Sequence, residues 1–136
     1  MNTMKSIYNK LFKEESTELA SHEVKLSIAD EIKTSIQKGK FAYDDLNESL
    51  SGYIEIKKQF DDLYKKSNDK HNQVKRFVEQ VQKWDGDSLT IYKKVLNASK
   101  ELGIQKEQIN GIAEFEKLIG NIGKLRGDAQ RILSQH

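Results

Sequence analysis

Residues Lys25 to Val81 read KLSIADEIKTSIQKGKFAYDDLNESLSGYIEIKKQFDDLYKKSNDKHNQVKRFVEQV and contain the longest regular pattern in the sequence. Apolar positions recur at alternating steps of four and three, the spacing of helices packed along a heptad seam. The seam positions are Lys25, Ala29, Ile32, Ile36, Gly39, Tyr43, Leu46, Leu50, Tyr53, Lys57, Phe60, Tyr64, Ser67, His71, Val74, Val78 and Val81. One helix of this length would measure about 85 Å. The chain is therefore expected to be elongated or to fold back as a hairpin.

Three places within this pattern are candidates for a helix break. Gly39 and Gly52 each cost a helix about 1 kcal/mol relative to alanine, and Ser67-Asn68-Asp69 offers turn and capping chemistry. We expect a break near Gly39, with Ser67 as a further candidate. Residues 16–84 would then form long heptad helices interrupted near 39 and 67.

Residues 1–15 are expected to form a short helix of their own. Four apolar residues fall on one side of it: Ile7, Tyr8, Leu11 and Phe12. Ser16 and Thr17 offer an N-cap at which the next helix would begin. An isolated helix of this length is marginal in water. Its apolar face is therefore expected to dock on the body of the protein or on a partner.

Two further helices are expected after the heptad pattern. Trp84-Asp85-Gly86-Asp87-Ser88 is typical of a turn, and residues 88–102 would form a helix ending in a cap at Gly103 and Ile104. The apolar face of that helix would comprise Leu89, Tyr92, Val95, Leu96, Ser99 and Leu102. Residues 108–135 would form the last helix. Its heptad positions are Ile112, Phe115, Ile119, Ile122, Arg126, Ala129 and Leu133, flanked by Leu118, Leu125 and Ile132.

A stripe of glycines lies within this last helix. Gly120, Gly123 and Gly127 are spaced by three and four residues, and each costs helix stability. Such a stripe would let another backbone approach closely. The first interpretation is a tight crossing inside the bundle, and the second is a contact with a partner.

The composition agrees with long helices in one domain. The chain has 136 residues and no proline, the residue that most reliably ends a helix. We predict an all-α fold, an elongated antiparallel helical bundle or coiled coil of four to five helices, with residues 1–136 in one domain. No apolar run is long enough for a signal peptide or a membrane span, so we expect an intracellular protein without membrane contact.

The sequence contains no recognisable catalytic or metal-binding pattern. There is no cysteine, which excludes thiolate catalysis. His22, His71 and His136 lie far apart and form no metal-binding motif. We therefore expect no catalytic residues, metal, cofactor or small-molecule substrate, and predict that the protein is not an enzyme.

A cluster of basic residues suggests an alternative function. With 23 Lys+Arg against 21 Asp+Glu, net charge implies no general attraction to nucleic acid. Seven basic residues nevertheless gather in one stretch: Lys57, Lys58, Lys65, Lys66, Lys70, Lys75 and Arg76. Asp61, Asp62 and Asp69 lie among them, which favours a solvated helix face. The alternative is a small cytoplasmic nucleic-acid-associated or regulatory protein that binds through this face.

Two short segments resemble the start of small coil-containing proteins encoded in the virion gene clusters of tailed bacteriophages. They are residues 4–12, MKSIYNKLF, and residues 17–24, TELASHEV, and Lys100-Glu101-Leu102-Gly103-Ile104 is similar as well. The resemblance implies a virion-associated structural protein, such as a capsid-decorating or neck-associated subunit present in many copies. It carries over no functional residues. The leading prediction is a non-enzymatic assembly protein whose partners are copies of itself or virion proteins.

Overall fold

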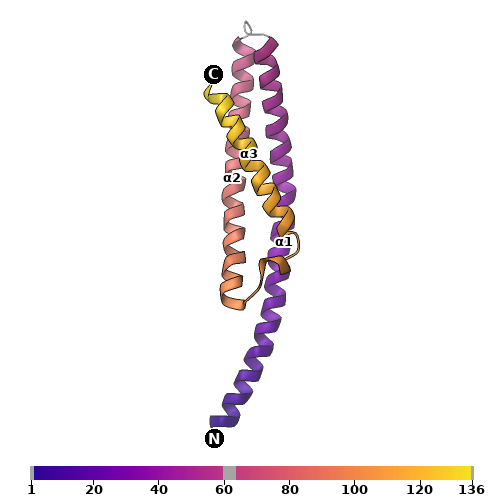
Figure 1. Ribbon diagram of the computed structural model, residues 1–136, viewed down its shortest axis with the longest axis vertical. Coiled ribbons are helices and arrows are strands. Elements are labelled where there is room, and N and C mark those ends of the chain that lie inside the picture. Colours follow the sequence, from indigo (N-terminus) through magenta and orange to yellow (C-terminus); the bar gives the residue numbers. More distant parts are fainter. Residues whose placement is uncertain (1, 60–63, 136) are drawn as a thin grey trace.

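The structure is a computed structural model that describes the backbone of residues 2–59 and 64–135 and the side chains of residues 20–58 and 67–135. The helices are α1 (Asn2–Gln59), α2 (Tyr64–Leu102), a short 3-10 helix η1 (Lys106–Gln108) and α3 (Ile112–Ser134). α1 and α2 form an antiparallel hairpin, and α3 packs along both of them (Figure 1). The prediction of an all-α fold is confirmed. Three α-helices are present in the described ranges, where four to five were expected.

The chain reverses after Gln59, and neither Gly39 nor Ser67 interrupts a helix. Gly39 lies inside α1 because it leaves space for a side chain of α2. A Cβ atom built there would lie 2.6 Å from ring atoms of Trp84 and 2.7 Å from a methyl carbon of Leu118. The Trp84 indole Nε1–H also donates a 2.8 Å hydrogen bond to the Ser35 carbonyl. The expected break near Gly39 was therefore wrong, because packing accounts for the glycine.

The expected turn at residues 84–88 was also wrong, since α2 continues through it. The Ser88 side chain is buried, and its hydroxyl donates a 2.8 Å hydrogen bond to the Trp84 carbonyl one helical turn earlier. Trp84 is buried as well, so the segment presents both residues to the core. Turn-forming residue types are accommodated here within a continuous helix.

The inward face of the C-terminal half of α2 differs from the expected one. Ser88, Val95 and Ala98 are buried. Leu89 and Leu96, which were assigned to the inward face, are instead exposed. Two apolar stripes overlap in this part of the sequence, and only the one that continues the register of Val74, Val78 and Val81 enters the core.

The hydrophobic core follows the predicted seam. Every seam position whose side chain is described is buried or half-buried, and Leu46 and Tyr53 are fully buried. α3 adds Phe115 and Ile122, both fully buried, to the same cluster. Burying one such side chain stabilises the fold by roughly 1.5–3 kcal/mol.

The expected cap at the end of α2 is confirmed. Gly103 has a φ of +66°, and its N–H donates a 3.1 Å hydrogen bond to the Ser99 carbonyl. Ile104 is buried directly after it, as expected for a hydrophobic residue that follows such a cap. This turn directs the chain through η1 and back along the hairpin as α3, which begins at Ile112, four residues later than expected.

The N-terminal part of α1 extends past the end of α2 (Figure 1). Glu31 pairs with Lys94, and the Tyr53 ring lies 5.7 Å from the His71 ring, which fixes the antiparallel register. In this register Leu102 lies level with a residue near 22, so about 20 residues of α1 extend beyond α2. α1 is continuous here, where a separate helix over residues 1–15 and an N-cap at Ser16 were expected.

Candidate functional site: an apolar groove between two helices

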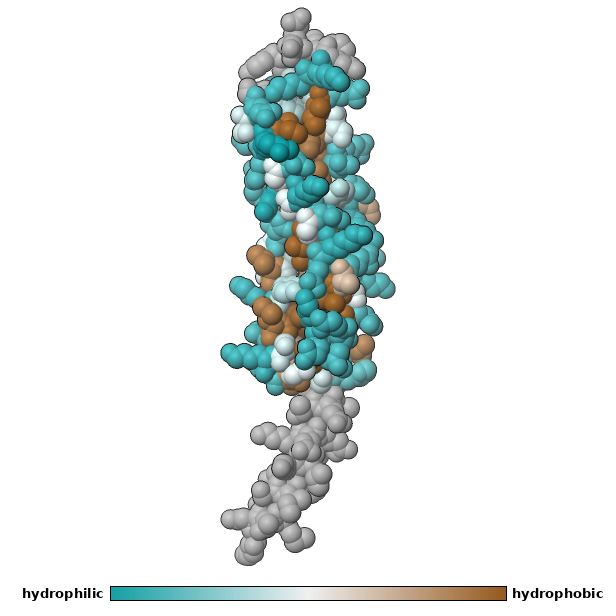
Figure 2. All heavy atoms as spheres, in the orientation of Figure 1, coloured by the Kyte–Doolittle hydropathy of each residue, from teal (hydrophilic) through white to brown (hydrophobic). Residues whose placement is uncertain are grey.

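One side of α2 exposes an apolar strip. Leu89 and Leu96 keep 64% and 58% of their surface exposed, and Tyr92 between them is half-buried. Positions i, i+3 and i+7 share one face of a helix, so the three side chains form a continuous row. Viewed with α3 in front, the surface has apolar patches surrounded by hydrophilic residues (Figure 2). A continuous exposed apolar row of this kind is typical of contact surfaces.

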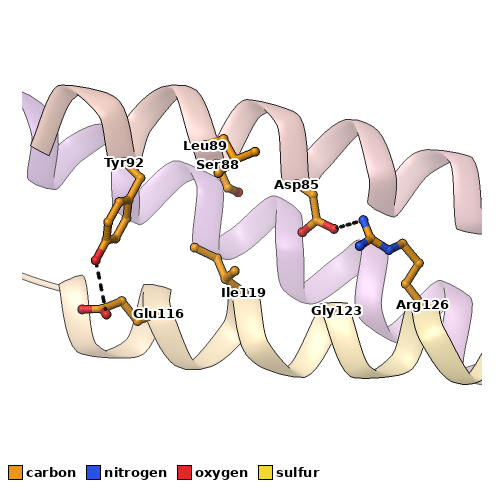
Figure 3. A pocket seen from close by; sticks show the side chains of 8 residues that line it. All are labelled: Asp85, Ser88, Leu89, Tyr92, Glu116, Ile119, Gly123 and Arg126. Carbon is orange, nitrogen blue, oxygen red and sulfur yellow. Dashed lines mark hydrogen bonds and ion pairs between the residues drawn. The ribbon is translucent and has the colours of Figure 1, made fainter. Parts of the chain in front are cut away.

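α3 supplies the opposite wall, and the two helices enclose an open groove of about 470 Å³ (Figure 3). Its floor and walls are lined by Asp85, Ser88, Leu89, Tyr92, Glu116, Ile119, Gly123 and Arg126. Ile119 points from α3 toward α2, and Gly123 leaves the α3 backbone accessible from the groove. Apolar side chains therefore occupy the middle of the groove.

An ion pair lies at one end of the groove. Arg126 Nη1 donates to Asp85 Oδ2 at 2.5 Å, and both side chains are partly buried. Burial raises the pKa of the Asp85 carboxyl above its ordinary value, and the Arg126 guanidinium opposes this rise without cancelling it. The pair holds α2 and α3 together at this end of the groove.

A second polar group lies at the other end. Glu116 Oε2 accepts a 3.4 Å hydrogen bond from the Tyr92 hydroxyl and a 3.3 Å contact from Lys106 Nζ. The hydrogen bond to Glu116 and its negative charge raise the pKa of the Lys106 ammonium. Polar groups thus border an apolar centre, an arrangement common in protein–protein contacts.

The predicted glycine stripe borders this groove. A Cβ atom built on Gly120, Gly123 or Gly127 would meet no described atom within 4 Å. The interpretation as a tight crossing inside the bundle was therefore wrong, since no described residue packs closely against these three glycines. The second interpretation, contact with a partner, stays a prediction, and only Gly123 lines the groove itself.

The other predicted interface lies outside the described side chains. Ile7, Tyr8, Leu11 and Phe12 fall on the part of α1 for which only the backbone is described. Their role as a docking face stays a prediction.

The hairpin brings several residues of the basic cluster to one end of the molecule. Lys57 and Lys58 lie in the last turn of α1, and Lys70, Lys75 and Arg76 lie in the first part of α2. Lys57 Nζ donates a 3.3 Å hydrogen bond to the Gln135 carbonyl and lies 5.8 Å from the centre of the Tyr53 ring. One member of the cluster is therefore engaged in holding the C-terminal end of α3. The side chains of Lys65 and Lys66 lie outside the described residues.

Among the residues with described side chains, no three His, Cys, Asp or Glu residues lie close enough together to hold a metal ion. No helix has, within its described part, an apolar stretch long enough to cross a membrane. The chain matches no protein-family model, no curated protein and no solved structure.

The groove was missed from the sequence because its two leucines share the spacing of core residues. The sequence offers Leu89 and Leu96 beside Val95 and Leu102, and a helix can bury only part of so wide a stripe. Which part is buried depends on where α1 and α3 lie. The only sign of the groove in the sequence is that this segment has more apolar residues than one seam can bury.

Proposed function

We propose that the protein is a non-enzymatic assembly protein that acts through helix-face contacts with other protein chains. The proposal is supported above all by the exposed row of Leu89, Tyr92 and Leu96 beside Ile119. Removing an exposed leucine from water stabilises a contact by roughly 1.5–3 kcal/mol. The row therefore favours association with another apolar surface.

The extension of α1 beyond the hairpin also supports this proposal. About 20 residues of helix lie beyond the end of α2. A helix gains most of its stability from packing against other elements. An extension of this kind is suited to contact with a second chain.

The proposed setting is a virion. The segments 4–12 and 17–24 resemble proteins from the virion gene clusters of tailed bacteriophages, and an elongated helical subunit present in many copies suits such a structure. Under this proposal the protein is a capsid-associated component, and its partners are copies of itself or other virion proteins. The seam of the hairpin would then pack in the manner of a coiled coil.

Light scattering on the purified chain over a wide concentration range tests the assembly function. The proposal predicts a mass that rises above the 15.7 kDa of one chain as concentration increases. A mass of one chain at every concentration, together with no binding to purified proteins of the same gene cluster, would exclude it. Far-UV circular dichroism on the same samples establishes that the helices are formed.

A nucleic-acid-associated protein is the second candidate function. It is favoured by one observation, the gathering of Lys57, Lys58, Lys70, Lys75 and Arg76 at the hairpin end. Phosphate contacts weaken steeply as salt increases, whereas apolar helix contacts do not. A salt titration of binding to a labelled oligonucleotide distinguishes the two: a steep loss of affinity favours this function, and no measurable binding at low salt excludes it.

A further inference from the structure

We infer that the groove between α2 and α3 receives the N-terminal segment of α1, residues 4–13, from a second copy of the chain. The two copies exchange these segments and form a closed two-fold dimer. This inference rests on the proposed assembly function and names the partner and the two surfaces that meet.

The lengths of the groove and the segment agree. The α2 residues that line the groove run from Asp85 to Tyr92, a rise of roughly 10 Å, and the exposed row continues beyond them to Leu96, roughly 17 Å from Asp85 along the helix. Residues 4–13 as a helix span roughly 14 Å. The row from Leu89 to Leu96 rises roughly 10 Å and the residues from Ile7 to Phe12 rise roughly 8 Å on a helix, so the two apolar stretches are of similar length.

The geometry excludes the segment of the same chain. α1 is one continuous helix from Asn2 to Gln59, and its N-terminal end points away from the bundle (Figure 1). The groove lies farther along the hairpin, beside the part of α1 that contains Glu31 and Gly39. The segment can reach its own groove only if α1 breaks and folds back. A second copy can supply it without changing α1.

The α3 wall of the groove admits a close neighbour. Gly123, which lines the groove, and Gly120, which lies beside it outside the lining, have no described atom within 4 Å of an added Cβ, so a helix can approach the α3 backbone there. Interhelical distances of about 8 Å, the short end of the usual range, require small residues at the contact.

Charge favours the same pairing. Residues 1–13 contain Lys5, Lys10 and Lys13 and no acidic residue. The charged residues that line the groove are Asp85, Glu116 and Arg126, two acids against one base. The segment is therefore basic, and the lining of the groove carries one more acid than base, with Lys106 beside Glu116 at its end.

Two-fold symmetry makes the proposed dimer a closed assembly. When two copies lie antiparallel, a contact between the segment of one and the groove of the other is accompanied by the reciprocal contact. Both segments and both grooves are then used, and no free surface remains for growth. A parallel arrangement would leave one groove and one segment open and would produce chains of indefinite length.

Engineered cysteines test the inference directly, because the natural chain has none. Chains carrying Leu11→Cys are mixed with an equal amount of chains carrying Leu89→Cys and oxidised mildly. The control mixture contains Leu11→Cys and Phe41→Cys, since Phe41 is 72% exposed on α1 and does not line the groove. We expect the mixed disulfide to form at least tenfold faster in the first mixture. Equal rates would overturn the inference.

A second measurement separates failure of this inference from failure of the assembly function. We expect Leu89→Asp with Leu96→Asp to raise the dissociation constant of the dimer by more than about 100-fold. Ile7→Asp with Phe12→Asp should do the same, while Phe41→Asp should change it less than threefold. If the wild-type chain associates and both double variants associate equally well, the groove is not the interface, although the assembly function stands. If the wild-type chain stays monomeric at all concentrations, this inference fails, and the assembly function fails with it only if the chain also binds no purified protein of the same gene cluster.

Discussion

Because glycine has no side chain, Gly39 allows α1 and α2 to pack closely at this position. Its place in α1 costs helix propensity, yet Trp84 occupies the space that a Cβ atom would need, 2.6 Å from the ring. The indole is held there by its hydrogen bond to the Ser35 carbonyl and cannot withdraw without losing it. The glycine therefore serves packing between α1 and α2.

Replacing Gly39 with alanine should destabilise the protein. The substitution gains about 1 kcal/mol of helix propensity but forces an overlap in a packed core, which typically costs 1–3 kcal/mol. We expect the free energy of unfolding to fall by about 1 kcal/mol in urea denaturation followed by circular dichroism. Gly127→Ala is the matched control, because Gly127 is exposed in α3 with open space around it, and we expect it to raise stability by about 0.5–1 kcal/mol. Effects of the same sign at both positions would contradict the packing role.

Asp85 should give the fold a dependence on pH. Burial raises its pKa in the folded protein above the ordinary 3.8. The folded state therefore holds the proton more tightly than the unfolded state, so the contribution of Asp85 to stability falls as pH rises from 3.8 through the folded pKa. Above that pKa the contribution is constant.

Removing the cation should enlarge this effect. We expect Arg126→Gln to raise the pKa of Asp85 further, because the guanidinium lowers it in the native protein. Nuclear magnetic resonance titration of the Asp85 carboxyl carbon measures both values. A lower pKa in the variant would contradict the assigned role of Arg126.

The helices themselves are longer than local sequence suggests, and α2 is the clearest case. Residues 84–88 have the composition of a turn, yet Gly86 lies within a continuous helix with open space around it. We expect Gly86→Ala to raise the free energy of unfolding by about 0.5–1 kcal/mol, as it does in an exposed helix interior. A glycine that a turn required would instead make this substitution destabilising. Urea denaturation distinguishes the two outcomes.

Helix type and core positions were predictable, and helix ends were mostly not. The heptad at Val74, Val78 and Val81 specifies which side of α2 is buried, because only one face can meet α1. The reversal after Gln59 does not change the spacing of apolar residues, so the period alone cannot locate it. Gly39 wrongly suggested a helix break, because the residue that accounts for this glycine, Trp84, is distant in the sequence. The Gly103 cap, by contrast, depends on neighbouring residues and was found.

The candidate site was harder to predict than the fold. Leu89 and Leu96 have the same residue type as core positions, and their exposure follows from where α3 lies across the hairpin. Arg126 was assigned to a heptad position, where it is half-buried, but its partner Asp85 is on another helix. Sites built between helices depend on tertiary contacts, which the helical period does not contain.

The described part of the molecule is a long bundle of three α-helices, one of which extends beyond the other two (Figure 1). A single copy leaves an apolar groove along its side and a stretch of α1 without a neighbour from α2. In the proposed dimer, the N-terminal segment of each copy fills the groove of the other, which accounts for both features. The shape of a single copy thus favours its assembly with a second one.

Light scattering coupled to size exclusion, carried out on the wild-type chain and on Leu89→Asp with Leu96→Asp, is the most direct experiment. We predict twice the 15.7 kDa mass of one chain for the wild type and the mass of one chain for the variant, with unchanged helix content in both. The leucines are exposed in the single chain, so their replacement should leave the fold intact. Equal masses for the two proteins, whether of one chain or of two, would contradict assembly through the groove.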